Sequence, residues 1–303
     1  MNTERTLKEE FLSLKQERRA IMLAHYYQEP EIQDLADFVG DSLALSRAAL
    51  KTTGDVILFC GVDFMAEGAS ILNPARTVLI PNTESHCPLA GMLDAGTVRQ
   101  MRQKYPDAAI ATYVNSLAEA KAESDIMFTS GNAVKIAQAL PNERIVMGPD
   151  RNLAVFVQRS LPEKRIIFMP DDGYCYVHRQ FSVKQVLGAR RNGFFVMVHP
   201  ECNPDVQEAA DFVGSTEQML KCAGETRQPK IAVGTEEGFT YPLKKRYPGK
   251  EFVPLDSSAI CKEMKVHTLE SATRALRDMK PQVKVEKNIA VRARKAIERM
   301  LAL

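Results

Sequence analysis

Residues 77–87 read TVLIPNTESHC, and the same pattern returns as RIIFMPDDGYC over residues 165–175 and as EFVPLDSSAIC over residues 251–261. Each stretch opens with a short apolar run, continues through a polar, turn-like segment and ends in a cysteine. The three cysteines, Cys87, Cys175 and Cys261, are separated by 88 and 86 residues. A fixed period of this kind is the sequence signature of repeated structural units.

Three further landmarks keep the same spacing to within one residue. The first is an apolar run that ends in a ring-bearing polar residue, with another polar residue two positions later: His25 and Tyr27, Tyr113 and Asn115, His199 and Glu201. The second is an apolar run that ends in a hydroxyl residue: Ser42, Ser130 and Thr216. The third is a Gly-x-Asp or Gly-x-Glu tripeptide: residues 61–63, 148–150 and 234–236. Four landmarks in one register predict three homologous units.

Each unit alternates short apolar runs with helical patterns. In the first unit, helices are expected over residues 4–19, 31–37, 43–50 and 65–72, strands over 21–24, 38–39, 56–59 and 78–80, and a connecting helix over 95–104. Apolar runs without alternation are typical of parallel strands buried on both faces. The sequence therefore predicts an α/β fold: three homologous parallel-sheet αβα domains (residues 1–91, 92–178 and 179–303) in a pseudo-threefold arrangement. C-terminal helices from about residue 268, with a basic solvated face, are expected to close the fold.

Composition narrows the function classes. The 303 residues are 45% hydrophobic and carry a net charge of +2, which gives no reason to expect nucleic acid or an acidic surface as a partner. The first ten residues are charged and lack the apolar core of a signal peptide, and no apolar run is long enough for a membrane helix. A cytoplasmic protein is therefore expected, in which six cysteines favour thiol or metal chemistry over disulfides.

The landmarks follow the last apolar residues of predicted strands, the edge at which open parallel sheets bind ligands. Three such edges around a common axis would place the landmarks in one central cavity. Three converging thiolates suit zinc or an iron–sulfur cluster, but closed zinc sites usually use short C-x-x-C spacings, which are absent here. Electron-carrying cubane clusters take four cysteines, so three would leave one iron open as a Lewis acid. Cys60, Cys202 and Cys222 lack counterparts in the other units and are expected to be ordinary buried thiols.

The hydroxyl residues precede helices, where they could be simple N-caps or part of anion sites for phosphate or carboxylate groups. Tyr27 and Glu201 form a candidate acid/base pair. His25 and His199, together with Tyr113, are expected to form a ring of donors. The other histidines, His86, His178 and His267, stay without an assigned role, because lone histidines are more often structural than catalytic.

Stretches that cover most of the chain carry a family resemblance. They are AHYYQ (24–28), ADFVGDS (36–42), GVDFMA (61–66), YVNS (113–116), TSGNA (129–133), GPDRNL (148–153), HPEC (199–202), VGST (213–216) and GTE (234–236), with the three periodic cysteines. In these motifs the chain resembles the quinolinate synthase family, the iron–sulfur enzymes of de novo NAD biosynthesis. The resemblance implies three homologous α/β domains around a central cluster.

The resemblance also implies an activity: condensation of iminoaspartate with dihydroxyacetone phosphate to give quinolinate, phosphate and water. It implies one [4Fe-4S] cluster held by Cys87, Cys175 and Cys261, with an open iron that binds substrate. The residues implied around the ligand are His25, Tyr27, Ser42, Tyr113, Asn115, Ser130, His199, Glu201, Ser215 and Thr216, and catalysis is expected from Tyr27, Glu201, His25, His199 and Asn115. The expected partners are these small molecules and, transiently, the enzyme that makes iminoaspartate.

Two positions depart from the family pattern. Tyr176 follows the second cysteine where the family usually has proline, and Cys261 stands alone where longer members have closely spaced cysteines. Two other function classes stay open. A non-catalytic iron–sulfur electron carrier or redox sensor would need a fourth protein ligand, and a triplicated metabolite-binding protein without metal would make the cysteines incidental.

Overall fold

The computed structural model describes residues 2–303, and its side chains from residue 6 onward. The strands form three parallel sheets of four strands each. The first sheet has the order β2-β1-β3-β4, with bounds β1 Ala20–His25, β2 Phe38–Gly40, β3 Val56–Cys60 and β4 Thr77–Leu79. The second has the order β6-β5-β7-β8, with bounds β5 Ala109–Tyr113, β6 Ile126–Phe128, β7 Arg144–Gly148 and β8 Arg165–Phe168. The third has the order β10-β9-β11-β12, with bounds β9 Phe195–Val198, β10 Phe212–Val213, β11 Lys230–Gly234 and β12 Glu251–Pro254.

The three sheets therefore share one strand order, and the predicted α/β class is confirmed. The central strands explain why the sequence shows no alternation: every residue of β3 and β5 is buried. Strands covered by helices on both faces read as continuous apolar runs.

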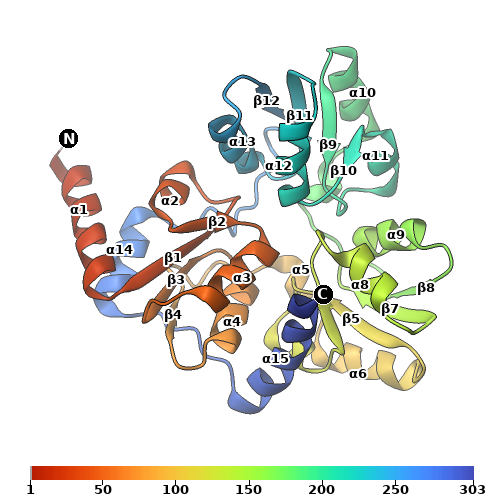
Figure 1. Ribbon diagram of the computed structural model, residues 1–303, viewed down its shortest axis with the longest axis horizontal. Coiled ribbons are helices and arrows are strands. Elements are labelled where there is room, and N and C mark those ends of the chain that lie inside the picture. The colour runs from red at the N-terminus through yellow and green to blue at the C-terminus, as the bar shows by residue number, and fades with distance from the viewer. Residues whose placement is uncertain (1) are drawn as a thin grey trace.

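Helices connect the strands and cover the sheets (Figure 1). In the first unit they are α1 Asn2–Glu17, α2 Pro30–Leu35, α3 Ser42–Lys51, α4 Asp63–Leu72 and α5 Pro88–Gly91. In the second they are α6 Ala95–Lys104, α7 Ala118–Ala122, α8 Ala133–Ala139 and α9 Arg151–Ser160. In the third they are α10 Val183–Arg191, α11 Pro204–Ala209, α12 Thr216–Glu225 and α13 Thr240–Arg246, with 3₁₀ turns at His178–Gln180 and Glu237–Phe239.

One polar contact is repeated in every sheet. Asp37, Asp125 and Asp211 stand just before the second strand of their units, and each accepts a hydrogen bond from a backbone N–H of the first strand at 2.7–2.8 Å. The donors are Met22, Ile110 and Val196. In each unit this bond connects the residue before the edge strand to the neighbouring central strand.

The C-terminal segment contains α14 Leu269–Asp278 and α15 Lys287–Ala302. Helix α14 packs against α1 and buries Leu276 in the core of the first sheet. Helix α15 packs on α4, α7 and β6 and buries Ile297 in an apolar cluster that runs from the first sheet into the second. Its basic side is exposed, where Arg292 pairs with Glu123 at 2.9 Å. The segment thus closes the fold with one buried and one solvated face.

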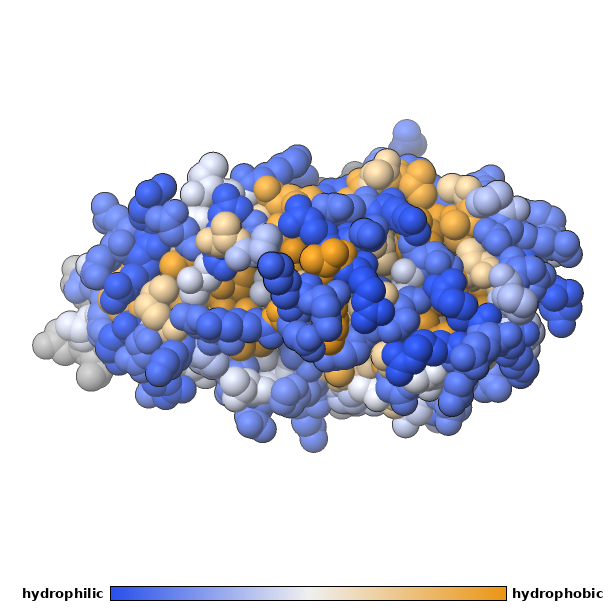
Figure 2. All heavy atoms as spheres, turned by 90° about the horizontal axis from the view of Figure 1, so that it is seen from below, coloured by the Kyte–Doolittle hydropathy of each residue, from blue (hydrophilic) through white to orange (hydrophobic). Residues whose placement is uncertain are grey.

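Figure 1 shows the three sheets placed around a common centre. The face seen in Figure 2 is largely hydrophilic, with apolar patches between charged side chains. Among the described helices, none has the length and apolar character needed to cross a membrane.

Candidate functional site

A cavity at the centre of the molecule is lined by loops that follow strands of all three sheets. It brings together every site residue predicted from the sequence except Ser215: His25, Tyr27, Ser42, Cys87, Tyr113, Asn115, Ser130, Cys175, His199, Glu201, Thr216 and Cys261. Val62, Phe64, Met65 and Met264 supply apolar walls. The cavity therefore combines thiols, imidazoles and hydroxyls, and its lining residues are buried or half-buried.

The three periodic cysteines occupy equivalent places. Cys87, Cys175 and Cys261 each follow the fourth strand of their sheet, β4, β8 and β12, and each is only partly exposed. Burial raises the pKa of all three thiols, and for Cys87 and Cys175 the neighbouring cysteines raise it further. Without a bound cation these groups are neutral thiols, whereas coordination to a metal would deprotonate them.

The spacing of the sulfurs bears on which metal group they fit. Two ligands on one ion at about 2.3 Å each are at most about 4.6 Å apart. Among the described residues, the group whose ligand atoms all lie within 4.8 Å of one another is Cys175, His178 and Glu201, and the three cysteines do not form such a group. Soft thiolates that lie farther apart than one metal ion allows are suited to a polynuclear iron–sulfur cluster.

The remaining cysteines lie elsewhere. Cys60 and Cys202 are fully buried in apolar clusters, and Cys222 is a partly buried residue of α12 that packs against an apolar cluster of the third unit. None of the three lines the cavity. A cubane cluster held here by cysteine alone would therefore have three ligands and one iron without a cysteine.

His25 and His199 have matching hydrogen bonds. Nδ1 of His25 accepts the backbone N–H of Tyr27 at 3.2 Å, and Nδ1 of His199 accepts that of Glu201 at 3.3 Å. Burial lowers the pKa of both imidazoles to about 3, so both are neutral near pH 7. Since Nδ1 accepts, the proton sits on Nε2, which becomes a donor toward the cavity. His199 Nε2 lies 3.1 Å from the hydroxyl of Ser130.

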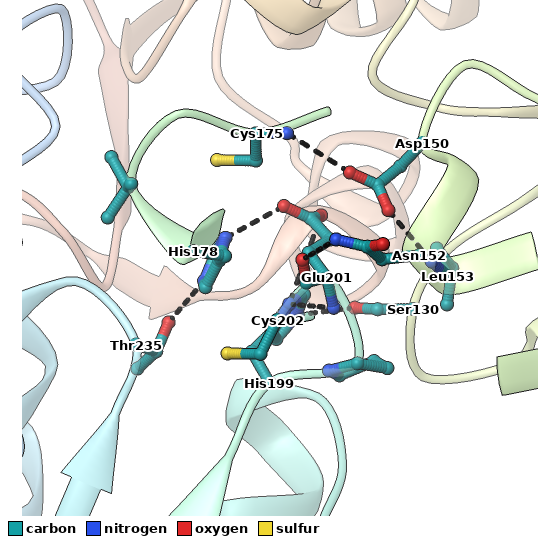
Figure 3. Close-up of polar contacts among 12 residues, drawn as sticks. Ser130, Asp150, Asn152, Leu153, Cys175, His178, His199, Glu201, Cys202 and Thr235 are labelled. Carbon is teal, nitrogen blue, oxygen red and sulfur yellow. Dashed lines mark hydrogen bonds and ion pairs between the residues drawn. The ribbon is translucent and has the colours of Figure 1, made fainter. Parts of the chain in front are cut away.

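Glu201 lies at the centre of the polar wall and is only 2% exposed. Its Oε1 accepts the hydroxyl of Tyr113 at 2.6 Å. Its Oε2 lies 2.8 Å from Nδ1 of His178 (Figure 3). Burial raises the pKa of this carboxyl, but His178, His199 and the bond from Tyr113 outweigh it and lower the pKa to about 2. Asn152 of α9 holds the main chain of Glu201 by donating to its carbonyl oxygen at 3.0 Å.

The contacts of Glu201 continue as a chain across the cavity wall. Nε2 of His178 lies 2.8 Å from the hydroxyl of Thr235, which lies 2.6 Å from the hydroxyl of Tyr27. Burial raises the pKa of Tyr27 well above its ordinary value, so this phenol stays protonated. Tyr27, Thr235, His178, Glu201 and Tyr113 thus form one continuous line of groups that can donate or accept a proton.

Sequence reasoning missed His178 and Thr235. His178, which the sequence left without an assigned role, lines the cavity and contacts Glu201. Its position three residues after Cys175 and the place of Thr235 within the third landmark were signals available in the sequence. His86 and His267 do lie outside the cavity, where His86 is exposed and His267 bonds the Gly61 carbonyl at 2.7 Å.

The hydroxyl residues differ from the simple caps considered above. The N-cap side chains of α3 and α12 are Asp41 and Ser215, which accept backbone N–H groups of their own helices. Ser42 and Thr216 are the first helical residues, and both line the cavity. Ser215 serves as a cap and lies outside the cavity lining.

Helix starts with free N–H groups beside a hydroxyl are anion sites. The buried Oδ1 of Asn115 also lines the cavity and has no hydrogen-bond partner among the described residues. Because buried polar atoms are normally paired, this atom is suited to bind a ligand donor.

Tyr176 has a defined role in the loop where it replaces the usual proline. Its hydroxyl donates to Glu263 at 2.6 Å and accepts the N–H of Lys262 at 2.9 Å. The loop of Cys175 is therefore bonded directly to the loop of Cys261.

Comparison with known proteins identifies the family of this chain. A sequence model of the family described as "Quinolinate synthetase A protein" matches residues 9–302. The quinolinate synthase of Pyrococcus furiosus is 49% identical over 299 residues, which cover 98% of each chain. Those of Thermococcus kodakarensis and Methanothermobacter thermautotrophicus are 49% and 47% identical, with 97% of each chain covered. The chain belongs to the quinolinate synthetase A family.

Proposed function

We propose that this chain is a quinolinate synthase, which condenses iminoaspartate with dihydroxyacetone phosphate to give quinolinate, phosphate and water. The observation that carries the proposal is the convergence of three cysteines and a polar ring, drawn from three sheets, on one cavity. The names of the full-length relatives support it. We further propose that residues 1–91, 92–178 and 179–303 are the three domains.

Cys87, Cys175 and Cys261 are the residues that would hold a [4Fe-4S] cluster. When bound, the cluster would supply a Lewis-acidic iron able to polarise a substrate oxygen. The apolar residues around the cysteines, among them Val62 and Met264, exclude water and strengthen electrostatic contacts in the cavity.

We assign substrate binding to the N-termini of α3 and α12 and to the neutral imidazoles. Both substrates carry anionic groups, and the N-termini of α3 and α12 with Ser42 and Thr216 are placed to bind carboxylate or phosphate. Nε2 of His25 and the hydroxyl of Ser130 add donors from the first and second units. The unpaired Oδ1 of Asn115 would accept from an amine or hydroxyl of the substrate.

Proton transfer is assigned to the chain that runs from Tyr27 to Tyr113. Glu201 is ionised at neutral pH and can take up a proton, while Tyr27 is protonated and can donate one. His178 and Thr235 connect these two groups, so a proton taken at one end can be replaced at the other. The elimination of water and phosphate and the closure of a ring need such transfers at several atoms.

The test is an anaerobic assay for quinolinate with reconstituted protein, oxaloacetate, ammonia and dihydroxyacetone phosphate. Quinolinate should form with the unaltered protein and with Cys222→Ala, but not with Cys175→Ala. A protein that takes up a cluster and makes no quinolinate would instead favour an electron carrier or redox sensor. A protein that takes up no iron would contradict the cluster assignment itself.

A further inference from the structure

The third periodic landmark, the Gly-x-Asp or Gly-x-Glu tripeptide, ends in a carboxylate that has no place in the proton chain or the anion sites. Its carboxylates, Asp63, Asp150 and Glu236, follow the third strand of each sheet, β3, β7 and β11. In every unit this carboxylate accepts a hydrogen bond from the backbone N–H of the periodic cysteine. The distances are 3.2 Å for Cys87, 3.1 Å for Cys175 and 3.3 Å for Cys261.

A second bond runs beside the first in each unit. The N–H of the carboxylate residue or of its successor donates to the carbonyl oxygen two residues before the cysteine. These pairs are Asp63 to Ser85 at 2.8 Å, Arg151 to Gly173 at 2.9 Å and Glu237 to Ala259 at 2.9 Å. In the second unit the loops approach so closely that a Cβ on Gly173 would lie 1.9 Å from the Pro149 carbonyl oxygen. Each cysteine loop is thus held at two points by the loop after the preceding strand.

We propose that Asp63, Asp150 and Glu236 are positioning residues that fix the main chain of the three cysteines for cluster binding. This inference rests on the proposed function, in which those cysteines hold the cluster. A simple helix cap would explain the second contact of Asp150, which accepts the N–H of Leu153 at 2.8 Å (Figure 3). It would likewise explain that of Glu236, which accepts the N–H of Gly238 at 2.9 Å. It does not explain why the other contact goes to the cysteine in all three units.

The three carboxylates share their oxygens differently, which provides a matched control. Asp150 uses Oδ1 for Leu153 and Oδ2 for Cys175, so an asparagine must turn its NH₂ group toward one of two N–H donors. Asp63 uses the same Oδ1 for Phe64 and for Cys87. An asparagine there keeps both bonds and turns its NH₂ group toward His86. Asparagine is as good an N-cap as aspartate, so Asp150→Asn can preserve the start of α9.

The experiment loads the unaltered protein, Asp150→Asn and Asp63→Asn with iron and sulfide anaerobically, and then measures the transfer of iron to a ferrous chelator. Thermal unfolding of the metal-free proteins is measured in parallel. Asp150→Asn should lose iron about tenfold faster than the unaltered protein, since the loss of one hydrogen bond changes an equilibrium constant by about a factor of ten. Asp63→Asn should lose iron at a rate within about twofold of that of the unaltered protein. The two metal-free variants should unfold at similar temperatures.

Equal iron loss from the two variants would overturn the inference while leaving the proposed function intact. So would faster loss from Asp150→Asn that is matched by an equal loss of metal-free stability, because the contact would then serve the fold alone. If Asp150→Asn does not fold, Glu236→Gln takes its place, since its two oxygens also bind different N–H groups, those of Cys261 and Gly238. If the unaltered protein takes up no cluster, the proposed function fails, and this inference fails with it.

Discussion

Replacing Glu201 by glutamine should separate catalysis from folding and cluster binding. Glutamine has the same shape, so one side-chain oxygen can still accept the Tyr113 hydroxyl, which lies 2.6 Å from Oε1. On the other side its NH₂ group can donate to Nδ1 of His178, at the place where Oε2 lies 2.8 Å away. The variant therefore keeps its neighbours but carries no charge and cannot take up a proton.

The magnitudes follow from these two contacts. A hydrogen bond to a charged group contributes about 1.5–3 kcal/mol and one to a neutral group about 0.5–1.5 kcal/mol, so the free energy of unfolding should fall by about 1–3 kcal/mol. Losing a general acid/base group lowers turnover by about 10²–10⁴-fold, or roughly 3–5 kcal/mol in the barrier. The catalytic loss should exceed the stability loss.

The assay is anaerobic single-turnover formation of quinolinate, with iron analysis and cluster spectroscopy on the same sample. Glu217→Gln is the matched control, because Glu217 accepts the Tyr26 hydroxyl at 2.8 Å but does not line the cavity. It should turn over at the unaltered rate. Turnover of Glu201→Gln within a few-fold of the unaltered protein would refute the assignment of proton transfer to this chain.

Three further predictions test other parts of the account. Tyr27→Phe should keep the cluster and bind substrate but turn over at least about 10²-fold more slowly, and turnover near the unaltered rate in single-turnover kinetics would argue against Tyr27 as a donor. Ser130→Ala and Thr216→Ala should each weaken quinolinate binding by about one to two decades in a titration, because each removes one bond to an anionic group, and unchanged affinity would contradict the anion sites. His199 has a pKa of about 3 in the fold and an ordinary value of 6.5, so the stability it gives is complete above pH 6.5 and is lost as pH falls toward 3. Between pH 7 and 5 the free energy of unfolding of the metal-free protein should fall by about 2 kcal/mol more than that of His199→Gln, as measured by denaturant titration.

The fold was largely predictable because its signals are local. The apolar runs of β1, β3 and β5 are unbroken, and the helix over residues 95–104 coincides with α6. The observed ends of some elements differ from the predicted ones by one or two residues, because side-chain contacts at the ends decide them. Helix α4 begins at Asp63, whose side chain accepts the N–H of Phe64, and not at residue 65.

The site was predictable only as far as the repeat extends. Cys87, Cys175 and Cys261 recur in register, so their convergence follows from three sheets around one centre. His178 was missed because it has no counterpart at the matching place in the other two units. Its role in proton transfer depends on contacts with Glu201 and Thr235, which follow strands of another sheet. Periodicity identifies what is shared between units, whereas proton transfer here uses what differs between them.

The paired cysteine loops show the same limit. The sequence flagged Asp63, Asp150 and Glu236 by period, but their contacts span 24 or 25 residues between two loops. Such hydrogen bonds depend on the tertiary approach of the loops. Likewise, Tyr176 stood out only as a departure from the family, and the structure was needed to connect it with Glu263.

The central claim is that three cysteines from three sheets hold one iron–sulfur cluster. The most direct test is iron and sulfide analysis of six alanine variants after anaerobic reconstitution, one for each cysteine. We predict that Cys60→Ala, Cys202→Ala and Cys222→Ala keep the cluster, because these residues lie outside the cavity. The variants of Cys87, Cys175 and Cys261 should each lose it. A full complement of iron and sulfide in any of the latter three would contradict the account.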